Sequence, residues 1–172
     1  MHDDRTANLL GAASLAVTDL VLAAARKKGV GPSAAAALVA LSAAPEITVT
    51  ELGRRIGLSQ SAAVRMVDGL AAAGLAERGG GRGRAVPVRL TAEGRTAAAE
   101  LLAARGAVLS GALADLPGAD REALNGLLSR LLASLYGRIG DTDLICRLCD
   151  RECCTTGAPC PVGAAAREAG GA

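Results

Sequence analysis

Residues 58–91, "LSQSAAVRMVDGLAAAGLAERGGGRGRAVPVRLT", change their pattern once, and that change decides the fold. The first half is rich in alanine and begins with small polar residues, which favours a capped helix from Ser59 to about Ala73. The second half is rich in glycine and arginine, and its apolar residues then alternate from Val86 to Leu90. Alternation of this kind is typical of a β-strand. The sequence therefore predicts a short helix followed by a two-stranded hairpin.

The segments on either side of this stretch are predicted to be helical. Apolar residues recur at three- and four-residue steps in residues 6–28 and form one stripe in residues 121–139. Prolines at both ends bound a helix over residues 32–44, and a Thr91 cap begins another over residues 92–116. A short helix over residues 51–57, with Thr50 as its N-cap, precedes the stretch. The predicted fold class is mainly α with a small β-hairpin wing, that is, a winged helix-turn-helix plus long dimerisation helices.

The order of these elements predicts three regions. Residues 6–44 and 92–139 form a helical dimerisation region, residues 45–91 a winged helix-turn-helix, and residues 141–172 a cysteine-rich tail without a clear periodic pattern. Within the hairpin, Pro87 requires an edge position, which a two-stranded ribbon provides.

Positive charge is concentrated around the predicted helix-turn-helix. The whole chain has a net charge of +2, but residues 54–95 contain eight arginines against three acidic residues, or +5, which leaves −3 for the rest. Such a patch is the electrostatic pattern of a phosphate-binding surface. The charge alone is equally compatible with a solvated face.

The second helix of a helix-turn-helix lies in the DNA major groove with its first side chains against base edges. Gln can pair bidentately with adenine, and Arg can reach guanine or phosphate. Arginines at a hairpin tip can enter the adjacent minor groove, where the potential is most negative. The candidate DNA-binding residues are Ser59, Gln60, Ser61 and Arg65 on the helix, and Arg78, Arg82 and Arg84 on the hairpin.

Residues 48–94, "TVTELGRRIGLSQSAAVRMVDGLAAAGLAERGGGRGRAVPVRLTAEG", resemble the winged helix-turn-helix of the MarR family of bacterial transcriptional regulators. The long helices on both sides extend the resemblance to about residues 6–139. It implies a homodimer that binds a palindromic operator and responds to a small ligand or an oxidant. Arg84 matches the family's wing arginine, but Arg82 stands where the family usually has an acidic residue.

Dimerisation is also expected from the distribution of apolar residues. The helix over residues 6–28 and a leucine stripe in residues 124–135 are too long and apolar for the winged domain to cover. Packing against a second copy would bury them and set two recognition helices about one DNA turn apart. The alternative is that both helices pack on their own domain.

All five cysteines lie in "CRLCDRECCTTGAPCPV", residues 146–162. Four thiolates can form a closed tetrahedral metal site, and a short tail would gain folding energy from the metal. The candidate ligands are Cys146, Cys149, Cys154 and Cys160, with Cys153 as the alternative to Cys154.

Thiolates suit both zinc and iron–sulfur clusters, and a Cys-Pro ending occurs in ferredoxin-type ligation. Zinc is the expected metal, an iron–sulfur cluster is the alternative, and free or disulfide-forming thiols remain open. The tail thus suggests either a metal- or redox-responsive regulator or a purely structural knuckle.

Other classes of function fit the sequence less well. An enzyme is not expected, because the only histidine is His2 and a Cys-x-x-Cys oxidoreductase would need a βαβ context. A protein-interaction module that uses the leucine-rich last helix, without sequence-specific DNA binding, is the alternative. The polar N-terminus and the lack of about 18 uninterrupted apolar residues predict a cytoplasmic protein without a membrane span.

Overall fold

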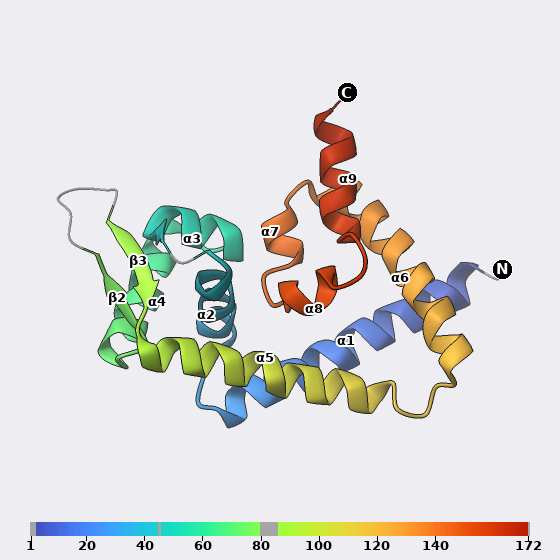
Figure 1. Ribbon diagram of the computed structural model, residues 1–172, viewed down its shortest axis with the longest axis horizontal. Coiled ribbons are helices and arrows are strands. Elements are labelled where there is room, and N and C mark those ends of the chain that lie inside the picture. The colour runs from blue at the N-terminus through green and yellow to red at the C-terminus, as the bar shows by residue number, and fades with distance from the viewer. Residues whose placement is uncertain (1–2, 45, 80–85, 172) are drawn as a thin grey trace.

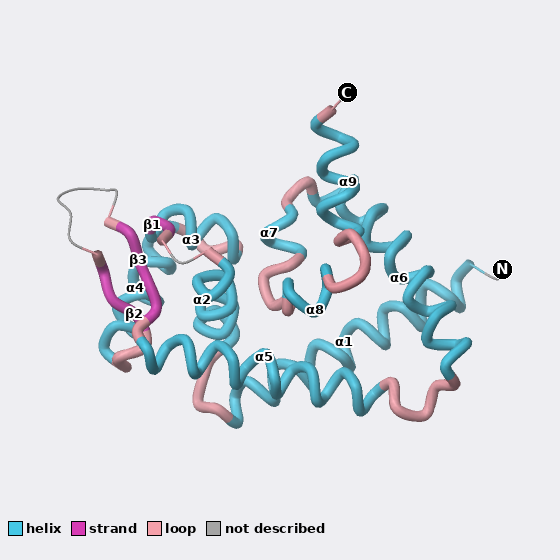
Figure 2. Tube along the Cα trace, viewed as in Figure 1, coloured by secondary structure: helices cyan, strands magenta, loops and turns pink. Residues whose placement is uncertain are grey.

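The computed structural model describes residues 3–44, 46–79 and 86–171, which form a largely helical molecule with one small sheet. Figure 2 shows the helices and the strands. The long helices are α1 (Asp3–Lys27), α2 (Pro32–Ala43), α5 (Ala92–Ala112) and α6 (Gly118–Ile139). The helix-turn-helix consists of α3 (Val49–Ile56) and α4 (Gln60–Ala72), and the tail contains α7 (Thr142–Ile145), α8 (Arg151–Thr155) and α9 (Pro161–Gly170). The predicted fold class is confirmed.

The sheet has three antiparallel strands in the order β1 (Ile47–Thr48), β3 (Pro87–Leu90), β2 (Ala76–Arg78). The expectation of a two-stranded ribbon was therefore wrong, because β1 adds a third strand beside β3. Pro87 also lies in the central strand, opposite Thr48, rather than at an edge. It is tolerated there because it is the first residue of the strand, and its carbonyl oxygen still accepts a hydrogen bond of 2.8 Å from the Gly79 amide.

The helix caps explain where the helices of the central region begin. Ser59 and Thr91 cap α4 and α5 as predicted, through side chains that accept hydrogen bonds from backbone amides three residues later. The cap of α3 was predicted two residues too late. Thr48, not Thr50, accepts the hydrogen bond from the Glu51 amide at 3.1 Å, and α3 begins at Val49.

The last part of the chain also differs from the expectation. Helix α5 ends at Ala112 rather than near residue 116, and α6 begins at Gly118 rather than at residue 121. The tail, in which no periodicity is visible, folds into three short helices, two of which begin with an aspartate cap, Asp141 and Asp150. These aspartates are local signals for the start of a helix, even though the tail has no apolar periodicity.

The core lies where α2 packs against α3, α4, α5 and the sheet. The middle of α2 is buried, including Leu38, and Leu52, Val67 and Val88 of the neighbouring elements are fully buried as well. In this core, helix backbones approach each other closely, and large side chains are few. A Cβ atom at Gly53 of α3 would lie 2.8 Å from the Cβ of Ala63 of α4, so the glycine sets how closely the two helices of the helix-turn-helix approach.

The elements are arranged along the molecule as Figure 1 shows. Helices α1 and α5 lie against each other, the helix-turn-helix and the sheet lie at one end, and α6 lies at the other. The tail helices fill the space between, with α7 against α3 and α9 against α6.

Helix α1 covers little of the core and exposes most of its apolar residues. By length and composition it could cross a membrane, with a mean hydropathy of 1.6 in a window of which none is buried. The sequence criterion of an uninterrupted apolar run did not detect it, because Thr18 and Asp19 interrupt the run.

The start of α5 tests this close packing. A Cβ at Gly94 would overlap the carbonyl oxygen of Leu75, a backbone atom that cannot rotate away. We expect Gly94→Ala to lower the free energy of unfolding by about 3 kcal/mol or more. Gly106→Ala in the same helix meets no atom within 4 Å and should instead stabilise by up to about 1 kcal/mol. Urea denaturation of both variants measures the difference, and equal effects would contradict this packing.

Candidate functional site

Helix α4 presents one polar face to solvent and one apolar face to the core. Ala63, Val67 and Leu70 are buried, whereas the predicted contact residues Ser59, Gln60, Ser61 and Arg65 are all exposed. The core therefore holds α4 from behind, and its first turn and a half is free to enter a groove. Arg65 forms no ion pair with any described residue.

Several of the clustered arginines are bound to carboxylates instead of facing solvent freely. Arg78 pairs with Asp68 of α4 at 2.6 Å, which links β2 to that helix. Arg89 pairs with Glu77 across the two strands at 2.8 Å. The charge count of the sequence thus overstates the cationic surface, because it cannot show which charges are paired.

The remaining two predicted contacts, Arg82 and Arg84, lie outside the described residues. The strands that lead to and from them end at Arg78 and begin at Pro87, so the wing is present as a hairpin base beside α4. Their role as wing-tip residues stays a prediction.

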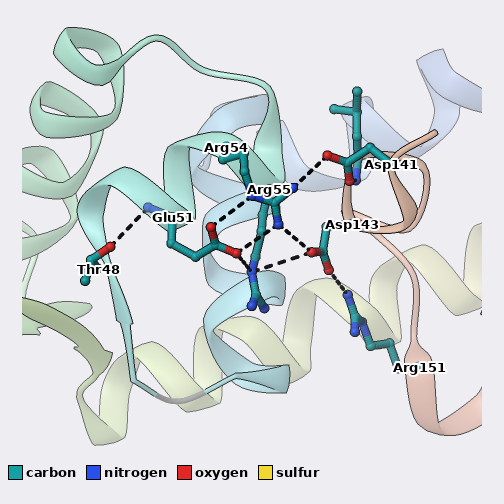
Figure 3. A network of polar contacts seen from close by, with 8 residues as sticks. Thr48, Glu51, Arg54, Arg55, Asp141, Asp143 and Arg151 are labelled. Atoms are coloured by element: carbon teal, nitrogen blue, oxygen red, sulfur yellow. Dashed lines mark hydrogen bonds and ion pairs between the residues drawn. The ribbon is translucent and has the colours of Figure 1, made fainter. Parts of the chain in front are cut away.

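A cluster of charged side chains joins the tail to the first helix of the helix-turn-helix (Figure 3). Arg54 of α3 donates hydrogen bonds to Asp141 at 2.7 Å and to Asp143 at 3.0 Å. Arg151 of α8 donates to the other oxygen of Asp143 at 2.8 Å. Arg55 lies 3.6 Å from the same carboxylate. Asp143 thus receives three arginines, two from the helix-turn-helix and one from the tail.

These contacts favour the ionised carboxylates. Burial opposes ionisation of Asp143, but Arg151, Arg55 and Arg54 outweigh it and hold its pKa below the usual value. Hydrogen bonds from Arg54 and Arg55 lower the pKa of Glu51 from 4.5 to about 2. Sequence reasoning assigned Arg54 and Arg55 to a phosphate-binding patch. The structure assigns them to the tail, and only the acidic residues near the cysteines could have signalled this.

The cysteines lie around one cavity of about 350 Å³ in the tail. Its wall includes Cys146, Cys149, Cys154 and Cys160. Cys153 and Cys154 are both exposed, but Cys153 does not line the wall. The neighbouring thiols of Cys146 and Cys149 shift each other's pKa in opposite directions, lowering that of Cys149 and raising that of Cys146. Among the described residues, no three His, Cys, Asp or Glu side chains come close enough together to hold a metal ion. The four thiols surround a space but do not meet at a point.

Comparisons with known proteins agree with this architecture. The model of the MarR family matches residues 28–85, from the residue after α1 to a point between β2 and β3. A MarR family protein from Bacillus stearothermophilus is similar with a TM-score of 0.71 at 20% identity, covering 78% of this chain and 96% of its own. No curated protein sequence matches.

Two further structures support the same assignment at similar coverage. YusO from Bacillus subtilis has a TM-score of 0.66 at 24% identity, covering 76% of this chain and 96% of its own. The MarR family protein Rv2887 from Mycobacterium tuberculosis has a TM-score of 0.62 at 26% identity, covering 75% and 95%.

The fold is that of a winged-helix regulator, and within that class it is the fold of the MarR family. The resemblance predicted from residues 48–94 is confirmed. The matches span almost the whole length of the related chains but leave about a quarter of this chain unmatched, so this chain is longer than the proteins it matches.

The network on α3 predicts a dependence of stability on pH. Folding lowers the pKa of Glu51, so its ionised carboxylate stabilises the folded protein. This stabilisation is complete above about pH 4.5 and is lost as the pH falls towards about 2. We expect Glu51→Gln to be less stable than wild type at neutral pH, with the difference disappearing as the pH approaches 2. Urea denaturation at a series of pH values measures it. A difference that stays constant over this range would contradict the role of the carboxylate. Glu168→Gln, at an exposed position of α9, should have no effect.

Proposed function

We propose that the protein is a dimeric, cytoplasmic transcriptional repressor of the MarR type that binds a palindromic operator. The observation that carries the proposal is the orientation of α4, whose apolar residues are buried and whose polar start is exposed. A helix held in this way can place its first side chains against base edges in a major groove. Rv2887, at 26% identity over 73% of this chain, has been solved in complex with DNA.

Each exposed residue of α4 has a role that its chemistry supports. Gln60 can make a bidentate pair with adenine, and Arg65 can reach guanine or phosphate. Ser59 and Ser61 lie 3.4 Å apart and can hydrogen-bond to bases or phosphates. Arg78 holds β2 against Asp68 and so orients the hairpin, from which Arg82 and Arg84 would reach the minor groove.

Dimerisation is supported by apolar surface that the single chain leaves uncovered. On α1, Leu15 is 70% exposed, and on α6, Leu127 is 55% exposed. No residue of α6 is buried, although the helix has 22 residues and a leucine-rich stripe. Exposed apolar patches of this kind mark interaction surfaces. A second copy is the partner that a palindromic operator requires.

A cavity between the helices could receive an effector. It measures about 310 Å³ and lies between α1, α2 and the tail, with Arg105 and Arg147 on its wall. Two cations in a partly apolar cavity suit a small organic anion. Rv2887, 27% identical over 72% of this chain, has been solved with salicylic acid.

The competing function is a protein-interaction module that uses the exposed face of α6 and does not bind DNA specifically. Fluorescence anisotropy with random duplex and with sequences selected from a random pool separates the two. A regulator should bind its selected sequence more tightly than random duplex, with an affinity that falls steeply with salt. Equal, weak binding to all duplexes, or none at low salt, would overturn the proposal.

Arg65 provides a test of the recognition helix. We expect Arg65→Ala to weaken binding to the selected duplex by about 1–3 kcal/mol, since it removes a contact to a base or a phosphate. Arg167→Ala removes the same charge from the exposed part of α9 and should leave the affinity unchanged. If both variants bind alike, the effect is one of net charge and α4 is not the reading element.

Leu127 provides a test of the dimer. Leu127→Arg places a charge in the exposed leucine stripe of α6, so we expect a monomer in analytical ultracentrifugation and a loss of operator affinity. Glu168→Arg adds the same side chain to the end of α9 and should remain dimeric. A dimeric Leu127→Arg protein would exclude this face from the interface.

A further inference from the structure

The cysteine cavity combines features that a DNA-binding role does not explain. Four thiols from three different segments face it, namely Cys146 and Cys149 around the end of α7, Cys154 of α8, and Cys160 at the start of α9. The helix of five residues that carries Cys154 turns Cys153 outward, because successive residues of a helix point about 100° apart. The fold thus selects four of the five thiols.

The surroundings of the cavity favour a negatively charged occupant. Arg151 is part of the wall and brings a positive charge to it. Cys160 is the N-cap of α9, which has ten residues, and no side chain caps its free amides. The positive end of this helix therefore faces the cavity. Gly163 and Ala166 of the same helix also line the wall, where larger side chains would fill the space.

The size of the cavity decides between a single ion and a larger group. A tetrahedral zinc ion draws four sulfurs to about 2.3 Å from one point. Here no three ligand side chains of the described segments converge in that way. The cavity of about 350 Å³ is roughly ten times the share of one water molecule. A cluster that brings its own sulfides between the irons holds the cysteines apart around such a space, and Cys160 is followed by proline as in ferredoxin-type segments.

We propose that this cavity binds a 4Fe–4S cluster through Cys146, Cys149, Cys154 and Cys160, and that the bound cluster holds α7 and α8 against the helix-turn-helix. The connection runs through Arg151, which lines the cavity and donates to Asp143. Asp143 accepts in turn from Arg54 of α3. Beside this contact, the Leu144 side chain lies 3.0 Å from where a Cβ at Gly57, in the turn between α3 and α4, would be.

The site itself is tested on the full chain, purified without oxygen or reconstituted with ferrous iron and sulfide. Wild type should carry about four irons and four sulfides per chain and show broad visible absorption from sulfur-to-iron charge transfer. Cys149→Ser and Cys160→Ser should each lose the absorption and most of the iron. Cys153→Ser, the matched control, should keep both.

Three outcomes would overturn the cluster site. These are about one zinc and no iron per wild-type chain, a metal-free wild type with five titratable thiols, and a Cys153→Ser variant that loses the cluster as fully as Cys149→Ser. The wild-type measurements do not depend on how well a variant folds, and circular dichroism of each variant identifies a folding defect.

The connection to the helix-turn-helix rests on the proposed function and is tested separately. Cluster-loaded wild type should bind the selected duplex about tenfold more tightly than the cluster-free protein, a coupling of ordinary size. Asp143→Asn should keep the visible absorption, because it is not a ligand, and bring that ratio close to one. If cluster-loaded and cluster-free wild type bind DNA with equal affinity, the proposed effect of the cluster on the helix-turn-helix is wrong, while the cluster site itself is unaffected by that result. Absence of DNA binding in both forms, with the absorption intact, would count against the proposed function instead.

Discussion

The shortage of large apolar side chains constrains the whole structure. The chain has one tyrosine and no phenylalanine or tryptophan, and many of the buried residues that the structure describes are alanine. Alanine buries little area, so stability depends on backbones that approach closely, as α3 and α4 do at Gly53 and α5 does at Gly94. A core of this kind is small. It does not cover α1 and α6, whose leucines remain exposed.

The same constraint explains why ion pairs, rather than a large apolar contact, hold the tail against the helix-turn-helix. Leu148 packs against the core, and Leu144 lies beside the turn of the helix-turn-helix. Exposed ion pairs are individually weak. The Asp143 side chain is only 18% exposed, however, and three arginines share it, so their contacts act together where water competes less. The polar network supplies a defined orientation that a few apolar contacts would not.

Local signals in the sequence predicted what local interactions determine. The caps at Ser59 and Thr91, the exposed start of α4 and the change to a hairpin all depend on residues a few positions apart. Some local signals were misread, since the cap of α3 is Thr48 rather than Thr50 and the aspartate caps of the tail were not predicted. The other errors arose where the interacting residues are distant in the sequence. Strand β1 joins β3 through Ile47 and Val88, and Arg54 meets Asp143 89 residues further along the chain. No periodicity or charge count encodes such pairs. Two arginines that looked available for phosphate are therefore engaged with the tail.

The tail contacts both the helix-turn-helix and α6, and in the proposed dimer a movement at either contact would change the same distance. Helix α7 packs against α3, at the helix-turn-helix end of the molecule, and α9 packs against α6, which carries the exposed leucine stripe. In a dimer joined through α6, a shift at either contact changes the separation of the two α4 helices. Two half-sites on DNA require that separation to be close to one turn, about 34 Å. A group bound in the cysteine cavity would therefore change the separation of the two α4 helices through both the α7 and the α9 contact. It would do so without contacting DNA or the second copy.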